Sequence, residues 1–143
     1  MSYLLDTNVV SELTRSRPNT KVLAWLRSLP TEEQFLSVLS VGEIRNGVER
    51  LDDARKREKL RLWLERDLAD RFGDRLLAVT AAVAGRWGRL RAEVRHSVPT
   101  VDSLLAATAL HHDLRLVTRN ERDFAGYPGL VVVNPWVVES NTG

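Results

Sequence analysis

The sequence predicts an α/β fold in which a central, mostly parallel β-sheet is flanked by helices. Short apolar runs alternate along the 143-residue chain with longer segments whose apolar residues recur at helical spacing. Strands that are separated by helices pair in parallel and have helices packed on their faces. A composition of 43% hydrophobic and 28% charged residues is typical of a globular domain, and the length predicts one domain over residues 1–143.

Two strands and four helices are expected in the first half of the chain. Pro18 and Asn19 end the first helix, and Pro30 ends the second. The fourth helix is long and charged, and its apolar side carries Leu60, Trp63, Leu64 and Leu68. The predicted strands are 3–6 and 34–40, and the predicted helices are 8–15, 20–29, 41–51 and 52–72.

The second half repeats the alternation with shorter strands. A helix follows Pro99, and a turn rich in Gly, Asn and Asp lies between the last two strands. The predicted strands are 76–79, 115–118 and 130–134, the helices are 80–95 and 101–113, and the turn is 119–129.

Composition also limits the surroundings and partners of the protein. The absence of cysteine excludes disulfides and thiolate metal sites and is compatible with a reducing cytosol. No apolar run reaches the roughly 18 residues of a membrane span, and no signal peptide is visible, so we expect a cytoplasmic protein without a membrane partner. The net charge is only +2, but 18 of the 21 basic residues are arginine, a composition that permits binding to nucleic acid.

Four acidic residues lie where an apolar element ends or begins: Asp6, Glu43, Asp102 and Asp123. In a parallel sheet the strand ends, and the starts of the helices that follow them, lie at one edge. We therefore expect the four carboxylates to meet around one crevice. Carboxylates brought together repel and raise one another's pKa, so a cluster of this kind persists when divalent cations neutralise it.

Each acidic residue also has a purely structural interpretation. Asp6 could cap the helix that follows it, and Asp102 could interact with a helix dipole. Glu43 completes an S-x-x-E capping box with Ser40. Asp123 could belong to a turn or to a cap from Asn120.

The ligand type selects the cation. Oxygen ligands prefer magnesium or manganese to zinc or copper, so the expected cofactor is Mg²⁺, with Mn²⁺ as the alternative. Asp6 and Asp102 would be the primary ligands, whereas Glu43 and Asp123 would hold water or a second ion. One or two such ions can activate water against a phosphodiester.

Neighbouring polar residues are expected to support this site. Thr7 and Asn8 would brace Asp6 through hydrogen bonds. Arg45 and Arg119 are candidate contacts to nucleic acid.

The motifs "LLDTNVVSEL", "SVGEIRNGV", "VDSLLAATALHHDLRLVTRNERDF" and "VVNPW" resemble those of PIN-domain proteins. More narrowly, the chain from Tyr3 to Trp136 resembles the VapC and FitB-like toxins of bacterial type II toxin–antitoxin pairs. The resemblance implies a PIN-like α/β/α sandwich whose acidic quartet is the four residues chosen above, with Asn120 in the same pocket. Ser103, which follows the third acidic residue, departs from the alanine expected there.

The resemblance also implies an activity and partners. It implies a toxin that acts as a magnesium-dependent endoribonuclease on RNA, with a cognate VapB/FitA-like antitoxin that inhibits it. It further implies a homodimer, or a heterotetramer or larger assembly with the antitoxin on DNA.

Two other functions stay open at this point. One is a catalytically inactive PIN module that binds RNA or protein. The other is a phosphatase or phosphotransfer domain, against which stands the absence of a D-x-D-x-T pattern after Asp6.

Overall fold

The five strands form one parallel sheet in the order β3-β2-β1-β4-β5. The computed structural model describes residues 1–137. β1 is central and pairs with both β2 and β4, so that Leu5 lies beside Leu36 on one side and Val117 on the other. The strands are β1 Tyr3–Leu5, β2 Gln34–Ser37, β3 Leu76–Leu77, β4 Arg115–Val117 and β5 Val132–Val133.

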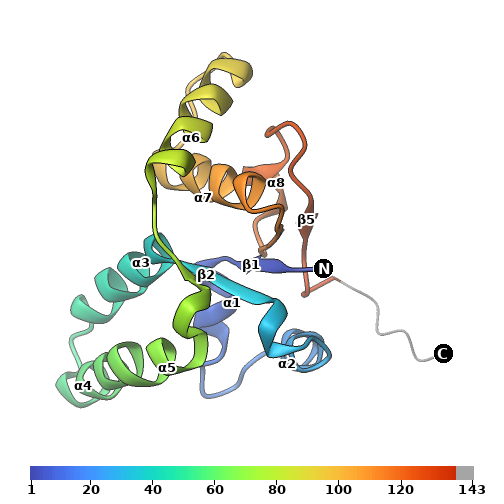
Figure 1. The fold of residues 1–143 in the computed structure, drawn as a ribbon. Helices are drawn as coiled ribbons and strands as arrows, with labels where there is room; N and C mark the ends of the chain where they lie inside the picture. Colours follow the sequence, from blue (N-terminus) through green and yellow to red (C-terminus); the bar gives the residue numbers. More distant parts are fainter. Residues whose placement is uncertain (138–143) are drawn as a thin grey trace.

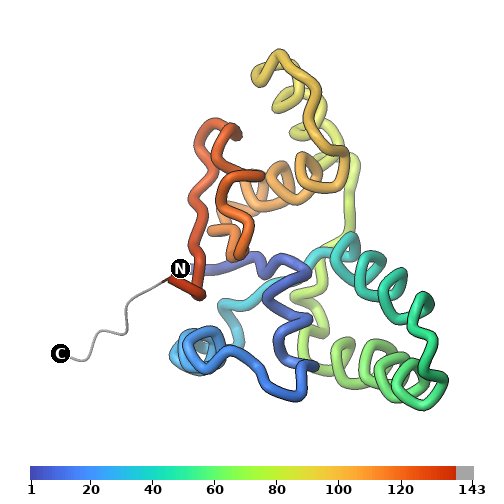
Figure 2. The backbone as a smooth tube through the Cα atoms, turned by 180° about the vertical axis from the view of Figure 1, so that it is seen from behind, coloured from blue at the N-terminus to red at the C-terminus, as the bar shows by residue number. Residues whose placement is uncertain are grey.

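Helices cover both faces of this sheet, which confirms the predicted α/β/α sandwich (Figure 1). One layer contains α1 to α5, and the other contains α6, α7 and α8; the chain crosses between them through β3, as the view from behind also shows (Figure 2). The longer helices are α1 Thr7–Glu12, α2 Thr20–Arg27, α3 Val38–Glu49, α4 Ala54–Leu62, α6 Ala81–Val94 and α7 Thr100–His111. The shorter helices are α5 Ala69–Phe72 and α8 Glu121–Phe124.

Alternate residues of the central strand enter two separate cores. Leu5 packs in a cluster with residues of α1, α2 and α3, whereas Leu4 packs with residues of α6 and α7. Both side chains are fully buried because parallel strands are covered on both faces. This is why the strands read as continuous apolar runs.

The second strand is shorter and its helix starts earlier than predicted. β2 ends at Ser37, whose side chain accepts a hydrogen bond from the Leu39 N–H and caps α3. Ser40 therefore lies inside the helix, where its hydroxyl has no hydrogen-bond partner among the described residues. The capping-box interpretation of Glu43 is wrong, because Glu43 lies in the second turn of the helix.

The predicted helix over 52–72 is present, but it is not uniform. Asp53 caps α4, and a π-helical segment, η2 Trp63–Leu68, joins α4 to α5. Its predicted apolar side is buried at Leu64 and Leu68 and half-buried at Leu60 and Trp63.

Other boundaries also differ from the sequence prediction. The strands predicted over 76–79 and 130–134 contain only two paired residues each, and the predicted turn contains α8. No described helix is long and apolar enough to span a membrane.

Candidate active site

Asp6 occupies the carboxyl end of the central strand. Its backbone N–H donates to the Val117 carbonyl at 2.9 Å, which continues the β1–β4 pairing by one residue. Its side chain caps α1 by accepting from the Thr7 N–H at 2.7 Å. Asp6 therefore lies both at the start of a helix and at the edge of the sheet. It is buried there, with only 6% of its surface exposed.

A polar network holds the second oxygen of Asp6. The Thr118 hydroxyl donates to Asp6 Oδ2 at 2.8 Å, and the Asn8 amide donates to the same oxygen at 3.3 Å. Thr118 also accepts from the Asn8 amide at 3.3 Å and from the Asn120 N–H at 3.1 Å. Asn8 and Asn120 are thus connected to Asp6 through the residue that follows β4.

Glu43 reaches the same edge from the neighbouring helix. Its Oε1 accepts a hydrogen bond from the Thr7 hydroxyl at 3.3 Å, although the two residues are 36 positions apart. Glu43 is exposed on the second turn of α3. Thr7 therefore contacts both acidic groups, through its N–H to Asp6 and through its hydroxyl to Glu43.

Asp102 lies in the first turn of α7, and the residue after it fixes that turn. Ser103 is fully buried; its hydroxyl donates to the Thr100 carbonyl at 2.9 Å and accepts from the Trp87 indole at 2.8 Å. Trp87 belongs to α6, so this bridge ties the start of α7 to the adjacent helix. The serine that departs from the expected alanine has a structural reason.

Asp123 is exposed on the short helix α8. Asn120 precedes this helix, but its side chain makes no capping hydrogen bond; the Asp123 N–H donates to the Asn120 carbonyl at 3.1 Å. A cap from the Asn120 side chain is therefore not the reason for the acidic residue.

The carboxylates influence one another electrostatically. Burial raises the pKa of Asp6 above its ordinary value of 3.8; hydrogen bonds from Thr118, Thr7 and Asn8 oppose this rise, and the charge of Asp123 adds to it. Partial desolvation by the neighbouring helices and the charges of Asp6 and Asp102 raise the pKa of Glu43, against the opposing hydrogen bond from Thr7.

The same coupling reaches the start of α7. Burial together with the charges of Asp6 and Asp123 raises the pKa of Asp102. All four acidic residues therefore belong to one electrostatic cluster, as their places at the sheet edge predict.

The donors of this cluster suit a hard cation. All are carboxylate oxygens, and each shifted pKa is raised, so a cation would relieve the cost of ionising them. Within residues 1–137 no three acidic or histidine side chains converge closely enough to hold an ion by themselves. Asp6 and Asp102 are the two carboxylates that could hold Mg²⁺, an ion that is often bound through one or two carboxylates and keeps several waters.

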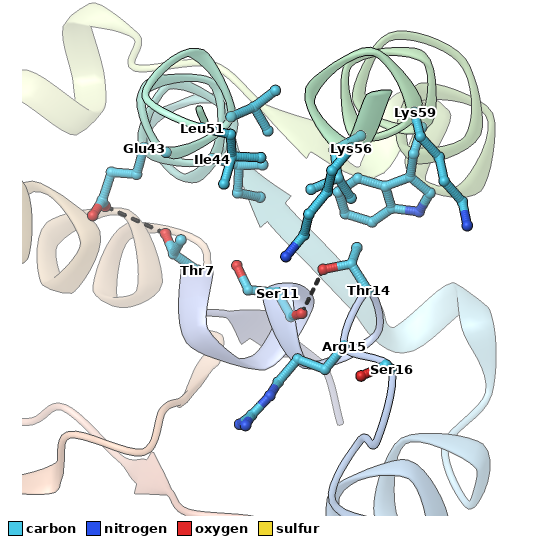
Figure 3. Close-up of a pocket in the computed structure, with 14 residues that line it drawn as sticks. Thr7, Ser11, Thr14, Arg15, Ser16, Glu43, Ile44, Leu51, Lys56 and Lys59 are labelled. Carbon is cyan, nitrogen blue, oxygen red and sulfur yellow. Dashed lines mark hydrogen bonds between the residues drawn. The ribbon is translucent and has the colours of Figure 1, made fainter. Parts of the chain in front are cut away.

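The carboxylates lie between two cavities. The larger, of about 590 Å³, begins at Thr7 and Glu43 and runs between α1, α3 and α4. Figure 3 shows Lys56 pointing into it towards Ser11, while the Thr7–Glu43 hydrogen bond lies at its other end. The smaller, of about 230 Å³, is lined by Asp102, Asp123 and the segment 94–99 among others.

The two arginines predicted to contact nucleic acid lie in different surroundings. Arg45 forms ion pairs with Glu49 at 3.4 Å and Glu65 at 2.9 Å on the surface of α3. Arg119 directly follows Thr118; its N–H donates to Asn8 at 3.2 Å, and its guanidinium lies 5.3 Å from the centre of the Trp136 ring. Arg119 is thus adjacent to the acidic cluster, whereas the Arg45 side chain is held by acidic partners.

A parallel sheet of this topology with an acidic cluster at its carboxyl edge defines the class: the chain belongs to the PIN-domain family, which it matches over residues 3–130. Within that family it is 37% identical to the toxin FitB of Neisseria gonorrhoeae over 93% of this chain and 97% of the relative. It is 31% identical to a VapC ribonuclease of Sinorhizobium fredii over 93% and 96%.

Solved structures agree with these relatives. A crystal structure of FitAcB from Neisseria gonorrhoeae matches with a TM-score of 0.88 and 36% identity, over 95% of this chain and 99% of that one. A DNA-bound VapBC from Salmonella typhimurium matches with a TM-score of 0.79 at 22% identity, which supports the fold alone.

The sequence assigned no role to three residues at this site, of which only Ser103 had been noted. Thr118 and Ser103 were present in the motifs, but their hydrogen bonds to Asp6 and Trp87 depend on the tertiary arrangement. Tyr127, which lines the smaller cavity, was not singled out. A polar residue ending a buried strand was the available signal for Thr118.

Proposed function

We propose that this protein is a magnesium-dependent endoribonuclease and the toxin of a type II toxin–antitoxin pair, with the carboxylates of Asp6, Glu43, Asp102 and Asp123 as its catalytic centre. The observation that carries the proposal is Asp6: a buried carboxylate at the end of the central strand, electrostatically coupled to acidic groups from three other elements. The names of its relatives, which include ribonucleases and a toxin, support the same activity.

The four acidic residues would have two different roles, binding the ion and activating water. Asp6 and Asp102 would hold the ion, because each is anchored on a rigid element, the end of β1 and the first turn of α7. A bound Mg²⁺ supplies Lewis-acid stabilisation to phosphate oxygens and lowers the pKa of water. Glu43 and Asp123 are exposed carboxylates on either side, suited to orient the attacking water or accept its proton.

The supporting residues keep this geometry. Thr118 and Asn8 direct their donors at Asp6 Oδ2 and the Thr7 N–H donates to Oδ1, so one lone pair of Oδ1 is left for an ion. The Thr7 hydroxyl orients Glu43. Such partners orient metal ligands and tune their basicity.

A protein partner is the second part of the proposal. Structures similar to this chain include a toxin–antitoxin complex from Klebsiella pneumoniae. We place the antitoxin segment in the larger cavity, whose lining includes the apolar residues Ile44, Val48 and Trp63 and the cationic residues Lys56 and Lys59. A segment with apolar and acidic residues would complement that surface.

The segment would also carry a cation into the catalytic centre. An arginine or lysine placed among the four carboxylates would neutralise the same charge as Mg²⁺, and arginine pairs bidentately with carboxylates. The homodimer stays a prediction, and light scattering of the purified protein measures it directly.

The activity is tested with purified protein and end-labelled RNA, in Mg²⁺ and in chelator. We expect the wild-type protein to cleave the RNA in Mg²⁺ but not in chelator, and Asp6→Asn to cleave it in neither. Asp113→Asn is the matched control, because Asp113 lies just beyond the other end of α7 and asparagine tolerates its left-handed backbone.

Three outcomes would contradict this function. Cleavage that persists in chelator would show that the reaction does not need a metal ion. Cleavage by Asp6→Asn at the wild-type rate would show that the acidic cluster is not the catalytic centre. Tight RNA binding without cleavage would indicate a binding module.

A further inference from the structure

Arg119 lies beside the catalytic centre and has no part in the chemistry proposed above. It follows Thr118 at the carboxyl end of β4, and Thr118 donates to the side chain of Asp6. Arg119 is exposed, and among residues 1–137 its guanidinium forms no ion pair, although the four carboxylates lie at the same edge of the sheet. An arginine that is next to an acidic cluster and pairs with none of its members can bind another anion.

The backbone of Arg119 is held from both sides. Its N–H donates to the Asn8 side chain at 3.2 Å, and the amide of Asn8 donates to Asp6. Its carbonyl accepts a hydrogen bond from the buried Asn134 side chain at 3.3 Å. These bonds fix the point from which the arginine side chain starts, relative to Asp6.

The side chain of Arg119 is held as well. Its guanidinium lies over the ring of Trp136, 5.3 Å from the ring centre. The same asparagine positions this ring, because the Trp136 N–H donates to Asn134 Oδ1 at 3.0 Å, and the ring packs against the core that contains Leu5. A cation–π contact uses the charge of the guanidinium without using its five N–H donors as hydrogen bonds to an acceptor, so these donors are available to an anion.

The position of Arg119 suits a phosphate group of a bound RNA. A guanidinium pairs with phosphate oxygens through two parallel hydrogen bonds. The strand order places Arg119 one strand further along the carboxyl edge than Asp6, and neighbouring strands are about 4.8 Å apart. On the β2 side, Arg45 is occupied by Glu49 and Glu65. An RNA whose scissile phosphate lies at the carboxylates would therefore present a neighbouring phosphate to the β4 side.

We propose that Arg119, held by Asn8, Asn134 and Trp136, binds the phosphate next to the scissile one on the β4 side of the catalytic centre. The inference rests on the ribonuclease function proposed above and adds a substrate-binding residue that sets the position of the RNA strand. Because the contact is to the RNA backbone, it strengthens binding of every sequence and selects no base.

The first test compares Arg119→Gln with Arg115→Gln. Arg115 is the first residue of the same strand, so it lies at the opposite edge of the sheet, and its loss changes the net charge equally. Binding of a single-stranded RNA is measured by fluorescence anisotropy in chelator at several salt concentrations, so neither magnesium nor cleavage is required. Each phosphate contact contributes about 0.7 to the slope of log affinity against log salt concentration.

We expect wild type and Arg115→Gln to share one slope. Arg119→Gln should have a slope shallower by about 0.7 and bind about five-fold more weakly at low salt. Arg119→Lys should keep the slope because the charge remains, but should bind about two-fold more weakly because lysine lacks the planar fork. Trp136→Leu should also bind about two-fold more weakly, because it removes the cation–π contact and leaves the charge. Melting temperatures check that each variant is folded in the assay.

A second test locates the phosphate. In a series of RNAs, one phosphate near the cut is replaced by an uncharged methylphosphonate, and cleavage is measured in Mg²⁺. At one position adjacent to the cut, the replacement should raise the KM of wild type and of Arg115→Gln about five-fold with little change in kcat. It should cost Arg119→Gln nothing further, which would identify this phosphate as the partner of Arg119.

Two results would overturn the inference. One is an equal salt slope in Arg119→Gln and Arg115→Gln. The other is that every methylphosphonate costs Arg119→Gln as much as it costs wild type, including the case of a lower kcat at unchanged KM, which would mean that Arg119 only positions the carboxylates. Failure of the two proposals is distinguishable: a shallower slope in Arg119→Gln without any RNA cleavage by wild type removes the ribonuclease function, whereas magnesium-dependent cleavage with equal slopes removes only the role of Arg119.

Discussion

Replacing Thr118 by valine tests the network that holds Asp6. Thr118 is fully buried, and valine keeps its shape but removes the hydroxyl that donates to Asp6 Oδ2 at 2.8 Å. Hydrogen bonds to charged groups contribute about 1.5–3 kcal/mol, so we expect the free energy of unfolding to fall by about 2 kcal/mol at neutral pH. For a chain of this length that corresponds to a melting temperature lower by about 6 °C.

The loss should depend on pH in a defined direction. The folded-state pKa of Asp6 is raised above its ordinary 3.8, so Asp6 contributes stability that is present below 3.8 and lost as the pH rises through its folded pKa. Removing the Thr118 donor raises that pKa further. The difference between wild type and variant should therefore be largest at pH 7 and shrink as the pH falls towards 3.8.

Denaturant unfolding from pH 4 to 8 measures both effects. Thr108→Val is the matched control: Thr108 is equally buried, but its hydroxyl donates to the Leu104 carbonyl within α7. It should cost about 1 kcal/mol or less, independently of pH. In an Asp6→Asn background, Thr118→Val should cost less than in wild type. Equal costs in both backgrounds would refute the network.

Three further predictions concern the site. Glu43→Gln should lower the cleavage rate at least about ten-fold, which corresponds to an activation free energy higher by about 1.4 kcal/mol. Its melting temperature should change little because Glu43 is exposed. A near-normal cleavage rate would mean that Glu43 has only a structural role. Ser103→Ala should lower the free energy of unfolding by about 1 kcal/mol, because it removes the hydrogen bond from the half-buried Trp87 indole; unchanged denaturant unfolding would contradict this bridge. Antitoxin and Mg²⁺ should each weaken the other's binding; calorimetry across a magnesium titration at constant ionic strength checks this, and a flat affinity would mean that the partner inhibits from outside the acidic cluster.

The layered fold follows from local patterns, whereas the boundaries of its elements do not. Leu4 and Leu5 are both buried, so an apolar run flanked by helical spacing identifies a parallel strand. The run 34–40 could continue as a strand or begin a helix, because its serines and apolar residues suit both. It becomes helical after Ser37 because the β1 strand beside it ends at Leu5 and offers no further pairing.

The site was predictable to the extent that sheet topology places it. Parallel strands bring Asp6 and the residues after β4 to one edge whatever the side-chain details. The hydrogen-bond partners of these carboxylates were not predictable. Thr118 lies 112 positions from Asp6, and no local sequence pattern links the two residues. The unpaired hydroxyl of Tyr127 could not be predicted from the sequence, because it is recognised only when its surroundings are known.

The unequal burial of the acidic residues explains how four carboxylates can lie together in a stable fold. Asp6 bears the cost of burial, but three donors at the ends of β1 and β4 hold it in one position. Glu43 and Asp123 stay exposed, so water screens their repulsion while no cation is present. A cation seated against Asp6 and Asp102 would offset both the burial and the repulsion that raise their pKa, and would attract the exposed carboxylates. In the proposed function, one fixed carboxylate is built into the fold, and either the ion or a cationic side chain of the antitoxin would assemble the others around it. We therefore expect the two to compete.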